Sequence, residues 1–199
     1  MSQQVTLKLT NVTLTQTTDT VQVTRTVPEV VIAGVSGPAG PTWAGKYGSF
    51  YASATQTPAQ VDVAQTVTFN GTYSASGISM VDSSKVTLPT VGTYTMTVVL
   101  QLSNLSNSTE TARFWLRLNN NDYPNSTTTC AVPKEKSQGV PHDSLVTLTF
   151  VGTSTAPNDY VQIFWQSSST SLTLKAEAIS TSPPYPASPS AILGITQVA

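Results

Sequence analysis

Apolar and small polar side chains alternate almost one by one along much of this chain. In residues 93–102 (TYTMTVVLQL) and 144–151 (SLVTLTFV), hydroxyl or amide side chains separate most of the apolar ones. A period of two is that of a β-strand which buries one face and exposes the other. Thr and Val also favour strands over helices. The pattern therefore predicts an all-β protein and excludes a helix bundle or a coiled coil.

The side chains expected on the exposed faces carry hydroxyls rather than charges. Ser and Thr together fill 57 of the 199 positions, whereas only 10% of the residues are charged, against about 25% in an ordinary soluble domain. The sequence contains nine Lys and Arg and ten Asp and Glu, so its net charge is close to zero. No basic patch is available to neutralise a phosphate backbone. No segment reaches the roughly 18 apolar residues of a membrane span. We therefore expect neither nucleic acid nor a membrane as a partner.

The only cysteine, Cys130, cannot form an internal disulfide, so the fold does not depend on an oxidising compartment. Residues 1–10 (MSQQVTLKLT) also lack the basic stretch and apolar core of a signal peptide. Both observations predict a protein that is made and assembled in a reducing cytoplasm.

Three regions follow from the patterning. Residues 1–33 read as short alternating strands with few large side chains, and such a ribbon is marginal alone. Another surface must therefore cover the apolar face of this N-terminal β arm. Residues 34–45 form a Gly/Pro segment, and residues 46–199 form the head domain.

The Gly/Pro segment has the spacing of collagen. Glycines recur every third residue with prolines between them, at Gly34, Gly37, Pro38, Gly40 and Pro41. Only Gly fits the crowded axis of a collagen triple helix. The register fails at Trp43, and a plain Pro/Gly linker is the alternative interpretation. Either way, the segment separates the arm from the head.

Short strand patterns separated by turn residues run through the head without any helical pattern. Their spacing of about 8 to 15 residues is typical of an antiparallel β-sandwich. The candidate strands span residues 46–53, 65–71, 78–82, 93–102, 112–118, 144–151, 159–166, 171–178 and 191–198.

The order of these segments adds a resemblance to a known family. The motifs, in chain order, are GSFYAS, TFNG, GTYTMTVVLQL, FWLRLN, DYVQIFW and PSAILGITQV. Together they resemble the complement-component-q and tumour-necrosis-factor-like heads, in particular the bacterial and bacteriophage versions that follow collagen-like stalks. The resemblance covers residues 46–199. It implies a jelly roll of about ten antiparallel strands that assembles as a homotrimer, with the stub on the threefold axis.

The resemblance also implies places for aromatic residues. Alternate positions would line the trimer axis, and the candidates are Tyr47, Phe50, Phe164 and Trp165, for each of which packing in the core is the alternative. Exposed loop aromatics, such as Tyr123 and Tyr185, are candidates for stacking on a sugar ring. Two departures from the family are a stub much shorter than a true stalk and the lack of the acidic cluster that forms a calcium site in some relatives.

No catalytic pattern is found. His142 is the only histidine, and its neighbour Asp143 would point to the opposite face of an extended strand. A Gly-x-Ser-x-Gly elbow and a Gly-rich phosphate loop are both absent. We predict that the protein is not an enzyme and has no cofactor.

Metal binding by one chain is not expected either. Cys130 has no second Cys or His at ligand spacing, which excludes a tetrahedral zinc site within one chain. The sequence leaves open whether three copies hold a metal ion on a trimer axis. Asp122 and Asp159 lie beside asparagines that suit calcium, but Asp and Asn also stabilise turns through their own backbones.

Two functions remain. In its arm, its low charge and its lack of an export signal, this chain is similar to virion proteins of tailed bacteriophages. The first hypothesis is a trimeric capsid decoration or cement protein, whose residues 1–33 bind the major capsid protein or another virion protein. The alternative is the tip of a tail or head fibre that binds a host-surface glycan.

Overall fold

A computed structural model describes residues 13–17, 20–24 and 45–199. The chain divides into two units, Met1–Thr42 and Trp43–Ala199. In the first unit, β1 (Thr13–Thr17) and β2 (Thr20–Thr24) pair as an antiparallel hairpin. The rest of the predicted arm lies outside the described residues. So does the collagen-like stub with Gly34, Gly37, Pro38, Gly40 and Pro41.

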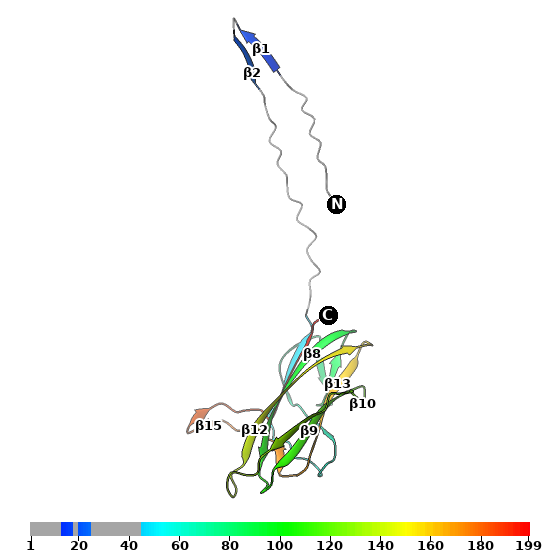
Figure 1. The fold of residues 1–199 in the computed structure, drawn as a ribbon, viewed down its shortest axis with the longest axis vertical. Coiled ribbons are helices and arrows are strands. Elements are labelled where there is room, and N and C mark those ends of the chain that lie inside the picture. Colours follow the sequence, from blue (N-terminus) through cyan, green and yellow to red (C-terminus); the bar gives the residue numbers. More distant parts are fainter. Residues whose placement is uncertain (1–12, 18–19, 25–44) are drawn as a thin grey trace. The chain divides into compact units, whose positions relative to one another are not determined.

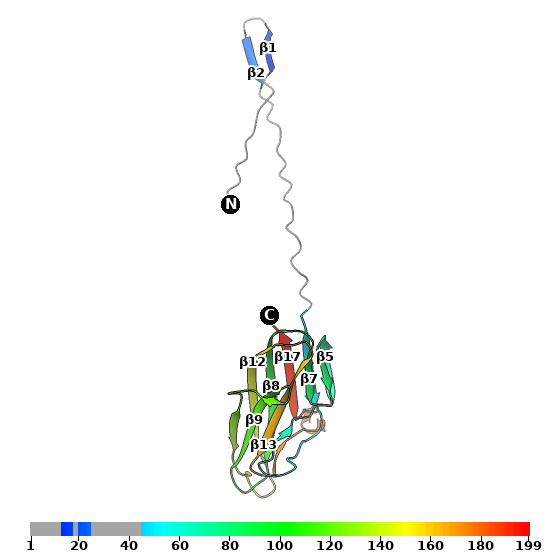
Figure 2. The same cartoon turned by 90° about the vertical axis from the view of Figure 1, so that its right-hand side faces the viewer.

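The second unit is built from two antiparallel sheets (Figures 1 and 2). The six-stranded sheet has the order β12-β8-β17-β3-β5, and β14 also pairs with β8. Its strands are β3 (Tyr47–Ala52), β5 (Gly71–Ser76), β8 (Gly92–Asn104), β12 (His142–Ser154), β14 (Leu172–Leu174) and β17 (Ala191–Gln197).

The seven-stranded sheet has the order β10-β9-β13-β7-β6, with β11 on β9 and β4 on β13. Its strands are β4 (Gln65–Thr66), β6 (Ser79–Val81), β7 (Lys85–Leu88), β9 (Glu110–Leu118), β10 (Asn121–Asp122), β11 (Thr128–Val132) and β13 (Asp159–Ser167). A separate two-stranded hairpin joins β15 (Ser180–Thr181) to β16 (Pro184–Tyr185).

The core lies between the two sheets and follows the period of two. In β8 every second residue from Tyr94 to Leu102 is buried, and β13 contributes Val161, Ile163 and Trp165 in the same way. Each large apolar side chain buried there contributes about 1.5–3 kcal/mol. The largest fully buried side chains are Trp165, Tyr94, Phe50 and Phe114.

The prediction of an all-β antiparallel head is confirmed, because the described residues contain strands and no helix. The predicted strand at 171–178 is too long, since only Leu172–Leu174 pair and the chain then leaves the sheet. Residues 128–132 are not among the candidate strands, but they form β11 on the edge of β9.

A buried carboxylate ties one end of the two sheets together. Asp159 is almost fully buried, and its Oδ1 accepts a hydrogen bond of 2.7 Å from Asn119 Nδ2. Its Oδ2 accepts bonds from Ser154 Oγ and from the backbone N–H groups of Thr155 and Ala156, at 2.9–3.0 Å. These bonds, with that from Asn119 first, lower the pKa of Asp159. Four protein donors therefore occupy the oxygens that were considered for calcium.

We predict that Asp159→Asn destabilises the head by about 1–3 kcal/mol, because the amide replaces an acceptor oxygen by a donor facing backbone N–H groups. Urea unfolding followed by tryptophan fluorescence measures the change. The pKa of folded Asp159 lies below its ordinary value of 3.8. The carboxylate therefore stabilises the fold above pH 3.8, and this contribution is lost as the pH falls toward the lowered pKa.

The matched control is Asp82→Asn, which changes an exposed carboxylate whose ion pair among the described residues is with Lys85, at 3.0 Å. Exposed ion pairs contribute little to stability. Equal effects of the two substitutions would contradict a structural role for Asp159.

Candidate functional site

The outer face of the six-stranded sheet carries no charged side chain over most of β12, β8, β17 and β3; the outward Asp143, near the start of the edge strand β12, marks the end of this uncharged region. Outward residues are those that alternate with the buried ones on β12, β8, β17 and β3. We call the uncharged members of this set the uncharged face. It comprises Leu145, Thr147, Thr149, Val151, Thr153, Thr93, Thr95, Thr97, Val99, Gln101, Ile192, Gly194, Thr196, Tyr47, Ser49 and Tyr51.

Apolar groups on the uncharged face are unusually open to solvent. Leu145 and Val151 are 66% and 64% exposed on β12. At the other edge, the rings of Tyr51 and Tyr73 lie with their centroids 4.4 Å apart. Depletion of charge together with aromatic and aliphatic groups is typical of the buried centre of a protein interface.

Gly194 lies in the middle of this face, where the fold of a single chain leaves room for a side chain. A Cβ atom at Gly194 would meet only the carbonyl oxygen of Thr97, at 4.0 Å. By contrast, a Cβ at Gly48 would lie 2.6 Å from the ring of Phe50, so the core itself requires that glycine. A glycine in a strand interior often marks the close approach of another backbone. Gly194 therefore leaves room for a surface that packs flat on the sheet.

Charged groups gather at one end of the uncharged face. Lys175 Nζ lies 3.0 Å from Asp143 Oδ2 and 2.8 Å from Glu177 Oε1. The bond with Glu177, followed by that with Asp143, raises the pKa of Lys175. These residues share a hollow with Gln101 and Leu145, which places them on the outward side of the sheet.

An exposed hairpin leaves the sheet beside these charges. Backbone bonds between Glu177 and Ser188 close its base, and in Figure 1 its strand β15 projects away from the two sheets. Residues 178–187 include no charged side chain. Ile179 is 73% exposed, and Tyr185 is also exposed. This hairpin is therefore a second uncharged, partly apolar surface.

The outer face of the seven-stranded sheet is different, because it combines aromatic and charged side chains. Trp115 and Phe164 lie opposite each other on β9 and β13, with ring centroids 5.9 Å apart. The guanidinium of Arg117 lies 3.9 Å from the Phe164 centroid, which is a cation–π distance. Asp122 Oδ1 accepts hydrogen bonds from Arg117 Nε at 2.6 Å and from Trp115 Nε1 at 2.8 Å. We call these four residues the Trp115 cluster.

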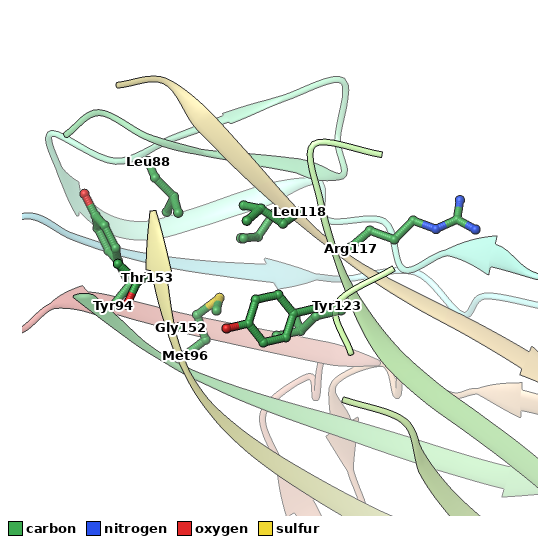
Figure 3. A pocket seen from close by; sticks show the side chains of 10 residues that line it. Leu88, Tyr94, Met96, Arg117, Leu118, Tyr123, Gly152 and Thr153 are labelled. Atoms are coloured by element: carbon green, nitrogen blue, oxygen red, sulfur yellow. The ribbon is translucent and has the colours of Figure 1, made fainter. Parts of the chain in front are cut away.

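A small apolar cavity lies between the sheets near this cluster (Figure 3). In Figure 3, Tyr123 points into the cavity and Arg117 points away from it. The cavity volume is about 20 Å³, which is enough for about one water molecule. Tyr123 thus closes the gap between the sheets, and the cavity has no room for a ligand.

The aromatic residues singled out in the sequence lie in different places. Phe50 and Trp165 are in the core, where the Trp165 Nε1 group has no hydrogen-bond partner. Tyr47 is on the uncharged face, whereas Phe164 is on the opposite outer face. Tyr185 is on the hairpin. Tyr123 is 36% exposed.

The other candidates do not come together. His142 begins β12 opposite Asn104, and Asp143 bonds Lys175 instead. Cys130 is half-buried in β11, and burial raises the pKa of its thiol. Within residues 13–17, 20–24 and 45–199, no group of three His, Cys, Asp or Glu side chains is placed to hold a metal ion.

The sequence analysis missed Gly194 and Trp115. Both stand at outward positions of predicted strands, so the period of two identified their side of the sheet. Their surroundings depend on strand pairing, which the sequence pattern does not contain.

Comparison with known proteins gives no relative: neither a family model nor a curated protein matches this chain. No helix long and apolar enough to cross a membrane is present in the part of the chain that the structure describes.

The hydrogen bond between Trp115 and Asp122 predicts an acid-sensitive fluorescence signal. Arg117, followed by Trp115, lowers the pKa of Asp122 below its ordinary value of 3.8. Protonating this carboxylate weakens the bond from the indole N–H, so Trp115 emission should change with a midpoint below pH 3.8. Asp122→Asn and Trp115→Phe should each remove the transition. Far-UV circular dichroism serves as the control that the sheets are intact, and a transition that persists in both variants would contradict the assignment.

Proposed function

We propose that this protein is a structural protein of a bacteriophage virion, a trimeric decoration or cement protein that coats or stabilises the capsid. The observation that carries the proposal is the uncharged face with Gly194 at its centre. A surface of this kind suits permanent contact with another protein. It has no groups arranged for chemistry.

The strand order supports a jelly roll for the head. From β7 onward, the strands β7, β8, β9, β12, β13 and β17 lie alternately in the seven-stranded and the six-stranded sheet. The first and last strands of the head, β3 and β17, lie side by side. Crossing between two antiparallel sheets in this way is the arrangement of jelly rolls.

Identical copies of this chain are the partners that fit the uncharged face. Copies related by rotation meet without like charges facing each other, and Thr and Ser hydroxyls cost far less to desolvate than charges do. The hairpin of residues 178–187 rises beside the same face, and we propose that it closes over the neighbouring copy. A trimer also matches the threefold positions of a capsid.

The oligomer is tested by placing a charge at its centre. Gly194→Lys should be accommodated in a single chain, because, apart from the two adjacent residues, the nearest atom of the described residues lies 4.0 Å from the new Cβ. We expect the variant to be a folded monomer in multi-angle light scattering, whereas the wild type is a trimer, because an unpaired lysine is costly to bury in an interface.

Ala131→Lys is the matched control, since Ala131 is exposed on β11 at the edge of the other sheet. This variant should remain trimeric. A wild-type monomer at micromolar concentration, or a trimeric Gly194→Lys variant, would contradict self-association through the uncharged face.

Capsid attachment is tested by removing residues 1–33. The head has its own core, so the truncated chain should stay folded and trimeric. Because we assign attachment to the arm, we expect the truncated chain to lose binding to capsids that were assembled without this protein. Co-sedimentation with such capsids measures the loss. A truncated chain that still decorates capsids would contradict this.

A further inference from the structure

A shallow groove beside the Trp115 cluster combines an aromatic wall with charged and polar side chains. It is lined by Arg113, Trp115, Asp122, Tyr123, Thr127 and Gln166, and it encloses about 230 Å³. Pockets for drug-sized ligands span about 300–1,000 Å³. The groove therefore has room for one small ring, with solvent on its open side.

The indole of Trp115 forms a fixed wall of this groove. Its Nε1 donates to Asp122, and Phe164 packs against it from the neighbouring strand. Arg117 in turn bonds Asp122 and covers Phe164. The aromatic surface is thus held in place before any ligand arrives, which lowers the entropic cost of binding.

Free polar groups stand next to this wall. Arg113 and Gln166 lie directly opposite each other on β9 and β13, and neither side chain makes a hydrogen bond or an ion pair within the described part of the chain. The Asp122 carboxylate uses Oδ1 for both of its bonds, which leaves Oδ2 to accept another. The groove therefore offers donors, an amide and a carboxylate oxygen around one aromatic surface.

We propose that this groove binds a pyranose unit of a glycan. The C–H face of the sugar would pack on the indole, while its hydroxyls bond Arg113, Gln166 and Asp122 Oδ2. A sugar ring is apolar on one face and polar at its rim, which matches this division. One unpaired cation is too little for a nucleic-acid backbone. The inference goes beyond the proposed function and does not depend on it, since the groove is on the other sheet from the uncharged face.

The test uses the full-length protein and saturation-transfer NMR with malto-, cello- and chito-oligosaccharides, oligogalacturonate and sialyllactose as probes at millimolar concentration. We expect the wild type to bind at least one probe. Trp115→Ala should weaken that binding about ten-fold, the loss expected for an aromatic contact. Trp115→Phe, which keeps an aromatic ring, should restore part of it.

A second variant keeps the test valid if Trp115→Ala does not fold. The double substitution of Arg113→Ala with Gln166→Ala removes two side chains without bonds in the chain, and it should also weaken binding several-fold. Arg113→Gln separates two kinds of sugar: selective loss of the acidic probes means a carboxylate bound by Arg113, and equal loss of neutral probes means hydroxyl recognition.

Tyr185→Ala is the matched control, because Tyr185 is an exposed aromatic residue on the distant hairpin. This variant should bind like the wild type. The proposal is overturned if the wild type binds none of the probes, if the Trp115 and Arg113/Gln166 variants bind unchanged, or if only Tyr185→Ala abolishes binding. Light scattering on the same variants should still give the trimer, so failure here is distinguishable from failure of self-association.

Discussion

Burial of one face of each sheet is the constraint on which the rest of this structure depends. With two sheets packed through their alternate residues, most of the core is made by one side of each strand, and Val67, Phe69 and Ile78 from the connections complete it. Every position between two core residues must then face outward, so core and surface share the same strands. A one-residue slip would exchange them completely. The long β8–β12 ladder, from Gly92 opposite Ser154 to Asn104 opposite His142, fixes this register over thirteen pairs.

The same alternation gives the molecule two unlike surfaces. On the six-stranded sheet the positions between core residues are mostly Thr, with Ser, Gly, Gln, Tyr and aliphatic residues, and the result is the uncharged face. On the seven-stranded sheet the corresponding positions of β9 are Arg113, Trp115 and Arg117, and the result is a charged aromatic surface. We assign assembly to the first surface and ligand binding to the second, so that each remains free when the other is occupied.

The sequence pattern predicts those parts of the fold that depend on local periodicity. Strands such as 93–102 and 159–166 are recognisable because their side chains alternate over many residues. Residues 128–132 were missed because β11 is a short edge strand whose pairing with β9 follows from distant contacts. The Trp115 cluster was missed for the same reason: Asp122 comes from the next strand, and Phe164 lies far along the chain. The special position of Gly194 becomes visible only when the empty space above it is known.

A surface rich in hydroxyls can be hydrated in a free chain and can also be buried in an assembly. Ser and Thr are hydrated while a copy is alone, yet burying a hydroxyl that finds a partner is inexpensive, whereas burying an unpaired charge is prohibitive. Within one sheet, Thr97 and Thr149 already lie 3.5 Å apart through their hydroxyl oxygens, so such groups can exchange partners among themselves. A lysine-rich face would keep copies apart, and a fully aliphatic face would aggregate without selectivity. The low charge of this chain therefore fits the assembly that we propose for this sheet, and the charged side chains of the opposite sheet fit the ligand contact that we propose there.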